Sequence, residues 1–369
     1  METLRKYLLP GLIFQSVIVG GGYATGRELV EFFLPSGPIG GVIGLVVAGL
    51  VFGVVMAAAY EFARVMRTFD YRTFTQKLLG PAWVVYEIAF IATVVLVLAV
   101  LGSASGELVA SSTGAPPIVG TMGMLLLVAL LTFYGSALIQ RVLAGWSVLL
   151  YLVYIVLFVV TFATFGDRID ANYVAADAGE GWLSGGVRYA GYNINPPAVL
   201  FCLVILTRRR EAIGAGLLTG ALAIIPALFF YVAMMAHYPE IGLEAVPALH
   251  MMAQLNIPWL QVIFHIVVFG TFVETGAGFL HAVNERIDHQ VKERGYELPR
   301  YARPLLAGGL MVLSIYGATA IGIVDLIAKG YGALAYVFII VLIIPLLTVG
   351  VWKIYKASRV FRIPYSTIR

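Results

Sequence analysis

The feature that most constrains this chain is a series of apolar stretches, each long enough to cross a lipid bilayer, that recurs from Leu8 to Val351. A hydrocarbon core about 30 Å thick requires roughly 20 apolar residues per helix. Hydrophobic residues make up 60% of the 369 residues and charged residues only 12%, whereas soluble domains are about 25% charged. A water-soluble fold cannot bury that much apolar surface, so the stretches are predicted to span a membrane.

The spans are predicted to be α-helices. Runs such as residues 124–131 and 148–160 are apolar or aromatic on every side, whereas strands of a membrane barrel alternate in polarity. A helix also satisfies its own backbone hydrogen bonds in lipid. We therefore expect an all-α integral membrane protein of about ten helices, near residues 7–34, 39–63, 81–111, 118–136, 142–165, 184–206, 211–236, 257–284, 303–320 and 328–352.

Basic residues predict the orientation of the ten helices. Most of the 24 Lys and Arg residues fall at the two ends of the chain and in alternate connections, around residues 64–77, 208–210 and 286–303. With ten spans these segments all lie on one side, which the positive-inside rule makes cytoplasmic. We expect a multi-pass protein of the cytoplasmic (inner) membrane with both termini in the cytoplasm. Topology explains the net charge of +4, so no nucleic-acid partner is expected.

Two of the expected helices contain segments that resist helix formation. The first carries three consecutive glycines, Gly20 to Gly22, followed by the charged pair Arg27 and Glu28. Glycine is unfavourable inside a helix, and charges facing lipid are costly. A close contact with another helix would explain the glycines but not the charges. An interruption of the helix at this point is therefore expected.

The sixth helix is expected to be interrupted as well. It contains Tyr192-Asn193-Ile194-Asn195 followed by Pro196 and Pro197, which remove two backbone donors and clash with the preceding turn. A simple proline kink without a binding site is the alternative. Non-helical backbone at membrane depth is tolerated where it is buried or lines a cavity.

The spacing of the interruptions predicts two five-helix halves of opposite topology, residues 1–165 and 166–352, followed by a cytoplasmic tail, residues 353–369. Helices one and six occupy equivalent positions in the two halves. Paired interruptions in equivalent helices indicate a transporter binding site near the bilayer midplane. The inverted repeat is inferred from the interruptions and the charge pattern.

These features resemble the leucine-transporter (LeuT) fold of the amino acid–polyamine–organocation superfamily. Within it, three stretches are similar to the YkvI-type bacterial membrane proteins: Gly20–Phe33 (GGGYATGRELVEFF), Tyr192-Asn193 and Glu274-Thr275-Gly276. The resemblance implies that a substrate binds between the interruptions of helices one and six, beside helices three and eight. It also implies an alternating-access cycle driven by a cation, and an outer gate formed by Arg27 with an acidic residue of helix ten, for which Asp325 is the candidate.

Glu274 is the strongest single candidate for ion coupling. A carboxylate inside the membrane is costly and by default marks an ion or proton path, although a structural ion pair or a hydrogen bond between helices is the alternative. Thr271, Glu274 and Thr275 share one helix face, and hard cations prefer oxygen ligands. The full set of candidates for Na⁺ or H⁺ coupling is Val19, Gly20, Thr271, Glu274 and Thr275.

The candidates for substrate binding supply backbone, hydroxyl and amide groups around the two interruptions. Backbone amides at the outer half of helix one favour a carboxylate on the substrate, and helix three adds a serine. These candidates are Gly20, Gly21, Gly22, Thr25, Ser103, Tyr189, Tyr192, Asn193 and Asn195.

The predicted function is cation-coupled secondary transport of a small solute, an amino acid or a related small organic acid. A solute receptor that uses the same fold without transport is the alternative. An enzyme is disfavoured, because the sequence shows no nucleophile–base pair and no metal-ligand spacing. No cofactor is expected besides Na⁺ or H⁺ as coupling ion, and the expected partners are the solute and the bilayer.

Overall fold

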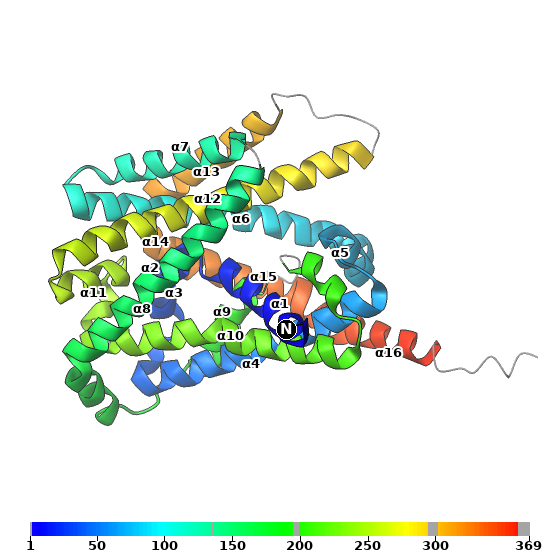
Figure 1. Ribbon diagram of the computed structural model, residues 1–369, viewed down its shortest axis with the longest axis horizontal. Coiled ribbons are helices and arrows are strands. Elements are labelled where there is room, and N and C mark those ends of the chain that lie inside the picture. Colours follow the sequence, from blue (N-terminus) through cyan, green and yellow to red (C-terminus); the bar gives the residue numbers. More distant parts are fainter. Residues whose placement is uncertain (1, 135, 195–198, 294–301, 361–369) are drawn as a thin grey trace, which may run out of the picture.

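A computed structural model describes residues 2–134, 136–194, 199–293 and 302–360, and within these ranges it contains helices and no strands. Figure 1 shows the helices as a bundle crossed by short, broken segments. The α-helices are α1 (Glu2–Ile18), α2 (Gly21–Thr25), α3 (Arg27–Phe32), α4 (Gly37–Met66), α5 (Tyr71–Leu79), α6 (Trp83–Thr113), α7 (Pro117–Tyr134), α8 (Ser136–Val174), α9 (Trp182–Asn193), α10 (Arg209–Met234), α11 (Pro247–Leu255), α12 (Pro258–Glu293), α13 (Ala302–Ala320), α14 (Ile323–Asp325), α15 (Gly332–Phe338) and α16 (Val351–Val360).

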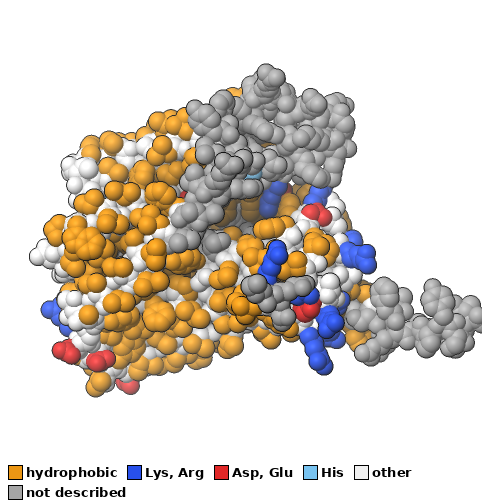
Figure 2. Space-filling model, in the orientation of Figure 1, with side chains coloured by type: hydrophobic (Ala, Val, Ile, Leu, Met, Phe, Trp, Pro, Cys, Tyr) orange, Lys and Arg blue, Asp and Glu red, His pale blue; other side chains and the backbone are white. Residues whose placement is uncertain are grey.

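The outer surface of the bundle is suited to lipid. Six helices are long and apolar enough to cross a membrane, and two shorter apolar helices accompany them among the described residues. Large side chains such as Leu50, Ile88 and Leu126 are more than 60% exposed. Figure 2 shows a broad hydrophobic flank, with Lys and Arg gathered at the end that carries α16. The chain is a multi-pass membrane protein.

The first helix is interrupted as predicted, at two points rather than one. Helix α1 ends at Ile18, and Gly20 is extended, with φ −94° and ψ −163°. After the single turn of α2, Gly26 adopts φ +78°, a left-handed conformation that glycine accepts at little cost. Helix α3 then continues to Phe32. The segment that the sequence marked as unable to remain helical is therefore divided between two short helices, α2 and α3.

The sixth helix is interrupted too. Helix α9 ends at Asn193, and Ile194 is extended, with ψ 106°. The chain resumes as a 3₁₀ helix, η4 (Leu200–Ile205). Pro196 and Pro197, whose effect on the helix was predicted, lie outside the described residues. The end of α9 and the end of α1 consequently both present non-helical backbone inside the bundle.

The last span, residues 323–360, departs from regular α-helix in a way that the sequence did not indicate. Between α14 and α15 lies a π-helical segment, η7 (Leu326–Tyr331), and two more follow, η8 (Ile339–Ile343) and η9 (Leu346–Gly350). Such wide turns occur frequently at functional sites, because they redirect side chains out of the α-helical register. Here η7 ends at Tyr331, whose ring is buried.

Helices α4 and α10 lie side by side (Figure 1) and pack closely through glycines. A Cβ atom on Gly220 would lie 2.2 Å from the carbonyl oxygen of Gly49 and 2.5 Å from the backbone nitrogen of Gly53. Backbone oxygen and nitrogen atoms cannot rotate away as a flexible side chain can. Absence of a side chain at Gly220 therefore sets the distance between the two helices.

Replacing Gly220 by alanine should lower stability by about 1–3 kcal/mol, because the added methyl forces the two backbones apart. Gly123→Ala on α7 is the matched control, since nothing lies within 4 Å of its Cβ position. Both substitutions change intrinsic helix propensity equally. Thermal unfolding of the detergent-purified variants measures the difference, and equal unfolding temperatures would contradict the close packing of α4 and α10.

Candidate functional site

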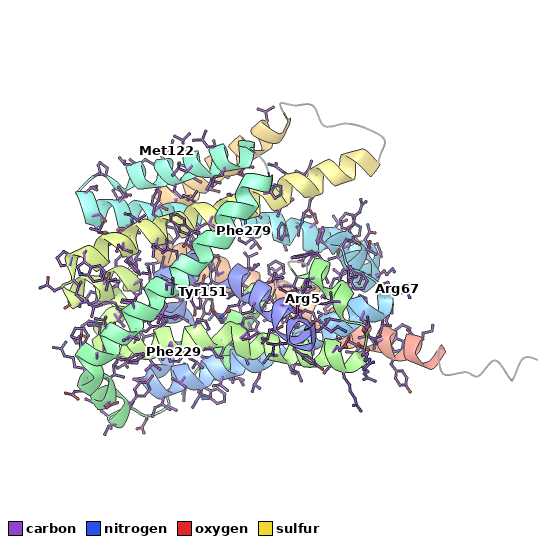
Figure 3. All side chains as sticks on the ribbon, viewed as in Figure 1. Arg5, Arg67, Met122, Tyr151, Phe229 and Phe279 are labelled. Carbon is purple, nitrogen blue, oxygen red and sulfur yellow. The ribbon has the colours of Figure 1, made fainter. Side chains whose placement is uncertain are left out.

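A cavity of about 60 Å³ lies between the interruptions of the first and sixth helices. Its walls come from α1, α2, α3, α6, α9, η7, α12 and α15. Phe279 of α12, one of the lining residues, is labelled in the middle of the bundle in Figure 3, whereas Met122 of α7 lies at its edge. The lining residues are Val17, Ile18, Gly20, Gly22, Glu28, Tyr86, Phe90, Thr93, Val97, Tyr192, Asn193, Ile194, Thr275, Phe279, Tyr331 and Phe338.

The carboxylate in this cavity belongs to Glu28, on α3. Glu28 is only 4% exposed, and the hydroxyl of Tyr192 donates a hydrogen bond to its Oε2. The neighbouring Asn193 also lines the cavity, and its side-chain amide donates to the carbonyl of Tyr189 at 3.2 Å. A Cβ atom on Gly22 would lie 1.9 Å from Glu28 Oε1. The glycine at position 22 therefore leaves the space that the carboxylate occupies.

Glu28 was expected from the sequence to be a charge that cannot face lipid, but it was not among the predicted site residues. The rule applied to Glu274, that a carboxylate inside the membrane marks a functional path, applies equally to Glu28. The signal was therefore present in the sequence. What the sequence could not show is which of the two carboxylates faces the cavity, because that depends on how α3 is turned after Gly26.

Aromatic rings hold Tyr192 in position. Its ring is stacked on Tyr331 of η7, with ring centres 4.6 Å apart, and on Phe32 of α3, with centres 5.5 Å apart. Tyr189, one turn earlier on α9, packs edge-on against Phe32 and Tyr192. Such pairs add stability beyond area burial. The rings of three separate segments thus fix the hydroxyl that contacts Glu28.

The structure brings four of the nine predicted substrate residues to the cavity: Gly20, Gly22, Tyr192 and Asn193. The other described residues on that list do not line it. Thr25 donates to the carbonyl of Gly22 at 2.6 Å and so stabilises the turn before Gly26. Tyr189 and Ser103 are buried outside the cavity lining. Gly21 begins α2, and Asn195 lies outside the described residues.

The predicted cation residues are divided between two places. Thr275 lines the cavity beside Gly20, whose Cβ would lie 3.0 Å from Thr275 Cγ2. Val19 is buried next to Gly20. The Thr271 hydroxyl donates to the carbonyl of Val267 at 2.9 Å, as buried threonines in helices commonly do.

Glu274 lines a second, larger cavity of about 590 Å³ between α6, α7, α8 and α12. Most of its lining is apolar, and Ser112 on α6 shares a hydrogen bond with His265 Nδ1 on α12 at 2.8 Å. The indole of Trp146 donates to the carbonyl of Val267 and packs over Gly270. Adjacent residues on α12, Glu274 and Thr275, therefore face different cavities.

The two predicted gate residues have different partners in this structure. Arg27 is buried, and its Nη1 donates to the carbonyl oxygens of Gly242 and Glu244, each at 3.0 Å. Its Nη2 lies 3.6 Å from Glu31 Oε2. Asp325 pairs with Lys329 at 2.9 Å; the side chain of Lys329 is exposed and that of Asp325 is about half exposed. Arg27 thus connects α3 to the loop around η6 (Glu240–Leu243).

A double-mutant cycle should reveal the steric match between Gly22 and Glu28. Gly22→Ala alone should destabilise the protein, because the new methyl displaces the buried carboxylate from Tyr192. The same change in a Glu28→Ala background should cost less, giving a coupling energy of about 0.5–3 kcal/mol. Thermal unfolding of the four proteins measures it. Simple additivity would mean that Glu28 does not occupy the space beside Gly22.

Comparison with known proteins gives one relative and one group of solved structures. No family model matches the chain. The uncharacterized membrane protein YkvI of Bacillus subtilis (strain 168) is 23% identical over 330 residues, which are 88% of this chain and 91% of that protein. Crystal structures of the Eremococcus coleocola manganese transporter share the fold. The structure of a mutant of this transporter aligns with a TM-score of 0.51 and 15% sequence identity, over 93% of this chain. The structure of its complex with an aromatic bis-isothiourea substituted compound aligns with a TM-score of 0.52 and 14% identity, over 94% of this chain.

These alignments cover 78% of the transporter chain and establish the fold of a membrane transporter. At that level of identity they carry no information on cargo. Within the described parts of this chain, no group of three or more His, Cys, Asp or Glu side chains is arranged to hold a metal ion. The cavity lining accordingly contains one carboxylate and neither histidine nor cysteine.

Proposed function

We propose that this chain, which has a transporter fold, is a cation-coupled secondary transporter of a small solute. It would work by alternating access, with ten spans arranged as a 5+5 inverted repeat in the cytoplasmic membrane and both termini in the cytoplasm. The sequence favours an amino acid or a related small organic acid as the solute. The resemblance to YkvI-type proteins and the interruption of two helices support the proposal.

The observation that carries the proposal is the buried carboxylate of Glu28 in a cavity between two interrupted helices. Burying a carboxylate in a membrane protein is costly, so a purely structural protein gains little from it. A transporter needs such a group, because it can bind a solute or an ion and release it on the other side. Non-helical backbone at Gly20 and Ile194 lines the same cavity.

The arrangement of the cavity supports an inward-facing conformation. Tyr86 and Phe90 belong to the first turns of α6, which follows the basic segment at residues 64–77. By the positive-inside rule that end is cytoplasmic. At the other end, Arg27 ties α3 to the loop around η6. The solute would therefore enter the cavity from the cytoplasmic side in this conformation, and the other side would be closed.

The coupling role proposed for Glu274 and Thr275 is compatible with this geometry. Thr275 reaches the cavity beside Gly20, while Glu274 precedes it on the lateral side of α12. A shift of α12 that follows protonation or ion binding at Glu274 would move Thr275 against the interruption of the first helix. Glu28 and Glu274 would then have separate roles, solute binding and ion coupling.

Uptake into proteoliposomes under an imposed Na⁺ or H⁺ gradient tests the proposal. With a radiolabelled amino acid mixture and radiolabelled ethylamine as probes, and protein-free liposomes as the blank, we expect accumulation that follows one of the gradients. Absence of gradient-dependent accumulation, with ligand binding retained, would indicate a receptor instead.

Substitution of the two carboxylates should separate binding from coupling. Glu28→Gln should weaken solute binding by about tenfold or more, because a charge-assisted hydrogen bond becomes a neutral one. Glu274→Gln should retain binding and lose the response of uptake to the gradient. Glu107→Gln is the control, since Glu107 is exposed near the end of α6. Full gradient-driven uptake by Glu274→Gln would remove Glu274 from the coupling mechanism.

Arg27→Gln should open the side of the protein that the loop around η6 closes. The substitution removes the guanidinium that bonds to two loop carbonyls. A Thr275→Cys reporter in a Cys202→Ala background should then react severalfold faster with an impermeant maleimide added outside right-side-out vesicles. Glu107→Gln is the control, because Glu107 is exposed near the end of α6. Asp325→Asn tests the predicted gate pair in the same assay. An unchanged labelling rate in Arg27→Gln would mean that Arg27 does not close this side of the protein.

A further inference from the structure

The charges of the cavity restrict the ligand. Among the lining residues Glu28 supplies a carboxylate, and none of them is Lys, Arg or His. A purely anionic ligand would bring a second negative charge beside Glu28 in a site largely removed from water, where unpaired charge is expensive. A ligand that carries a positive charge would instead complete an ion pair. The electrostatics therefore favour a cation.

Several polar side chains of the cavity already donate a hydrogen bond within the protein. The hydroxyl of Tyr192 donates to Glu28, and the hydroxyl of Thr93 donates to the carbonyl of Ala89 at 2.8 Å. The amide nitrogen of Asn193 donates to the carbonyl of Tyr189 at 3.2 Å. The oxygen atoms of these three side chains can still accept hydrogen bonds from a ligand. N–H donors on a ligand match them.

Aromatic rings form much of the cavity wall. Six lining residues are aromatic: Tyr86, Phe90, Tyr192, Phe279, Tyr331 and Phe338. The two faces of Tyr192 are covered by Tyr331 and Phe32, and the guanidinium of Arg286 lies 3.3 Å from the ring centre of Phe90. Tyr86 packs edge-on against Phe338 with ring centres 5.8 Å apart. What the rings offer a ligand is therefore mainly apolar surface, which suits a short alkyl chain.

The volume of the cavity restricts the size of the ligand. One water needs roughly 10–15 Å³ by this measure of volume, so about 60 Å³ accommodates only a few heavy atoms. An ammonium with a chain of two or three carbons fits this space. Larger solutes would require the walls to move.

From charge, hydrogen bonding and shape together, we infer that the cavity binds a compact primary ammonium ion, with its N–H groups donating to Glu28 and its alkyl chain against the aromatic rings. The inference rests on the proposed function only for the identification of the cavity as the solute site. It narrows the solute from an amino acid or organic acid to an amine that carries no carboxylate.

Binding to the detergent-purified protein tests this without requiring transport. Ethylammonium chloride, alanine and sodium propionate are compared by isothermal titration and by thermal shift, at constant ionic strength. We expect ethylammonium to bind at least tenfold more tightly than alanine and propionate to show no saturable binding. Equal or tighter binding of alanine or propionate would overturn the inference.

The contribution of Glu28 is tested with Glu28→Gln, which should weaken ethylammonium binding at least tenfold. Glu107→Gln is the control and should leave ethylammonium binding unchanged. If Glu28→Gln does not fold, Tyr192→Phe retains the carboxylate and should change the affinity while preserving the preference for ethylammonium over propionate. Binding of ethylammonium without gradient-driven uptake would leave the inference standing and contradict the transporter proposal. Gradient-driven uptake of amino acids that excess ethylammonium does not inhibit would support the transporter proposal and contradict the inference of an ammonium site.

Discussion

The rest of the structure depends on one constraint: inside a bilayer, every backbone group must find a hydrogen-bond partner within the protein. A chain with glycines at 20–22 and prolines at 196–197 cannot keep two of its spans helical. The ends of α1 and α9 therefore have to turn inward, where other segments cover them. The hydroxyl of Tyr154 on α8, for example, donates to the carbonyl of Ala24 next to the interruption. The cavity forms where the two interruptions meet.

Within that cavity, local chain geometry and side-chain chemistry depend on each other. The left-handed turn at Gly26 lets α3 change direction after α2, and this carries Glu28 back over Gly22. The carboxylate then meets the hydroxyl of Tyr192, whose ring is held between Phe32 and Tyr331. Three segments far apart in sequence are needed to hold one charge, so the position of Glu28 responds to the relative placement of all three. That sensitivity suits a group that binds and releases a ligand.

Helix α12 contacts both cavities because consecutive helical residues point about 100° apart. Thr275 faces the interruption of the first helix, and Glu274 faces the lateral cavity between α6, α7 and α8. One helix therefore lines both the central cavity and the mostly apolar lateral cavity that contains the carboxylate of Glu274.

The sequence by itself determined the membrane-spanning, all-helical class and the positions of both interruptions, because these follow from hydropathy and from the backbone limits of glycine and proline. It also identified Gly20, Gly22, Tyr192, Asn193 and Thr275, which the structure places around one cavity. Only the tertiary structure decided which carboxylate faces that cavity, and that Tyr331 from a π-helical turn completes it. Those outcomes depend on the rotation of α3 after Gly26 and on the register of η7 against α9, and neither rotation nor register between distant segments is encoded in local sequence.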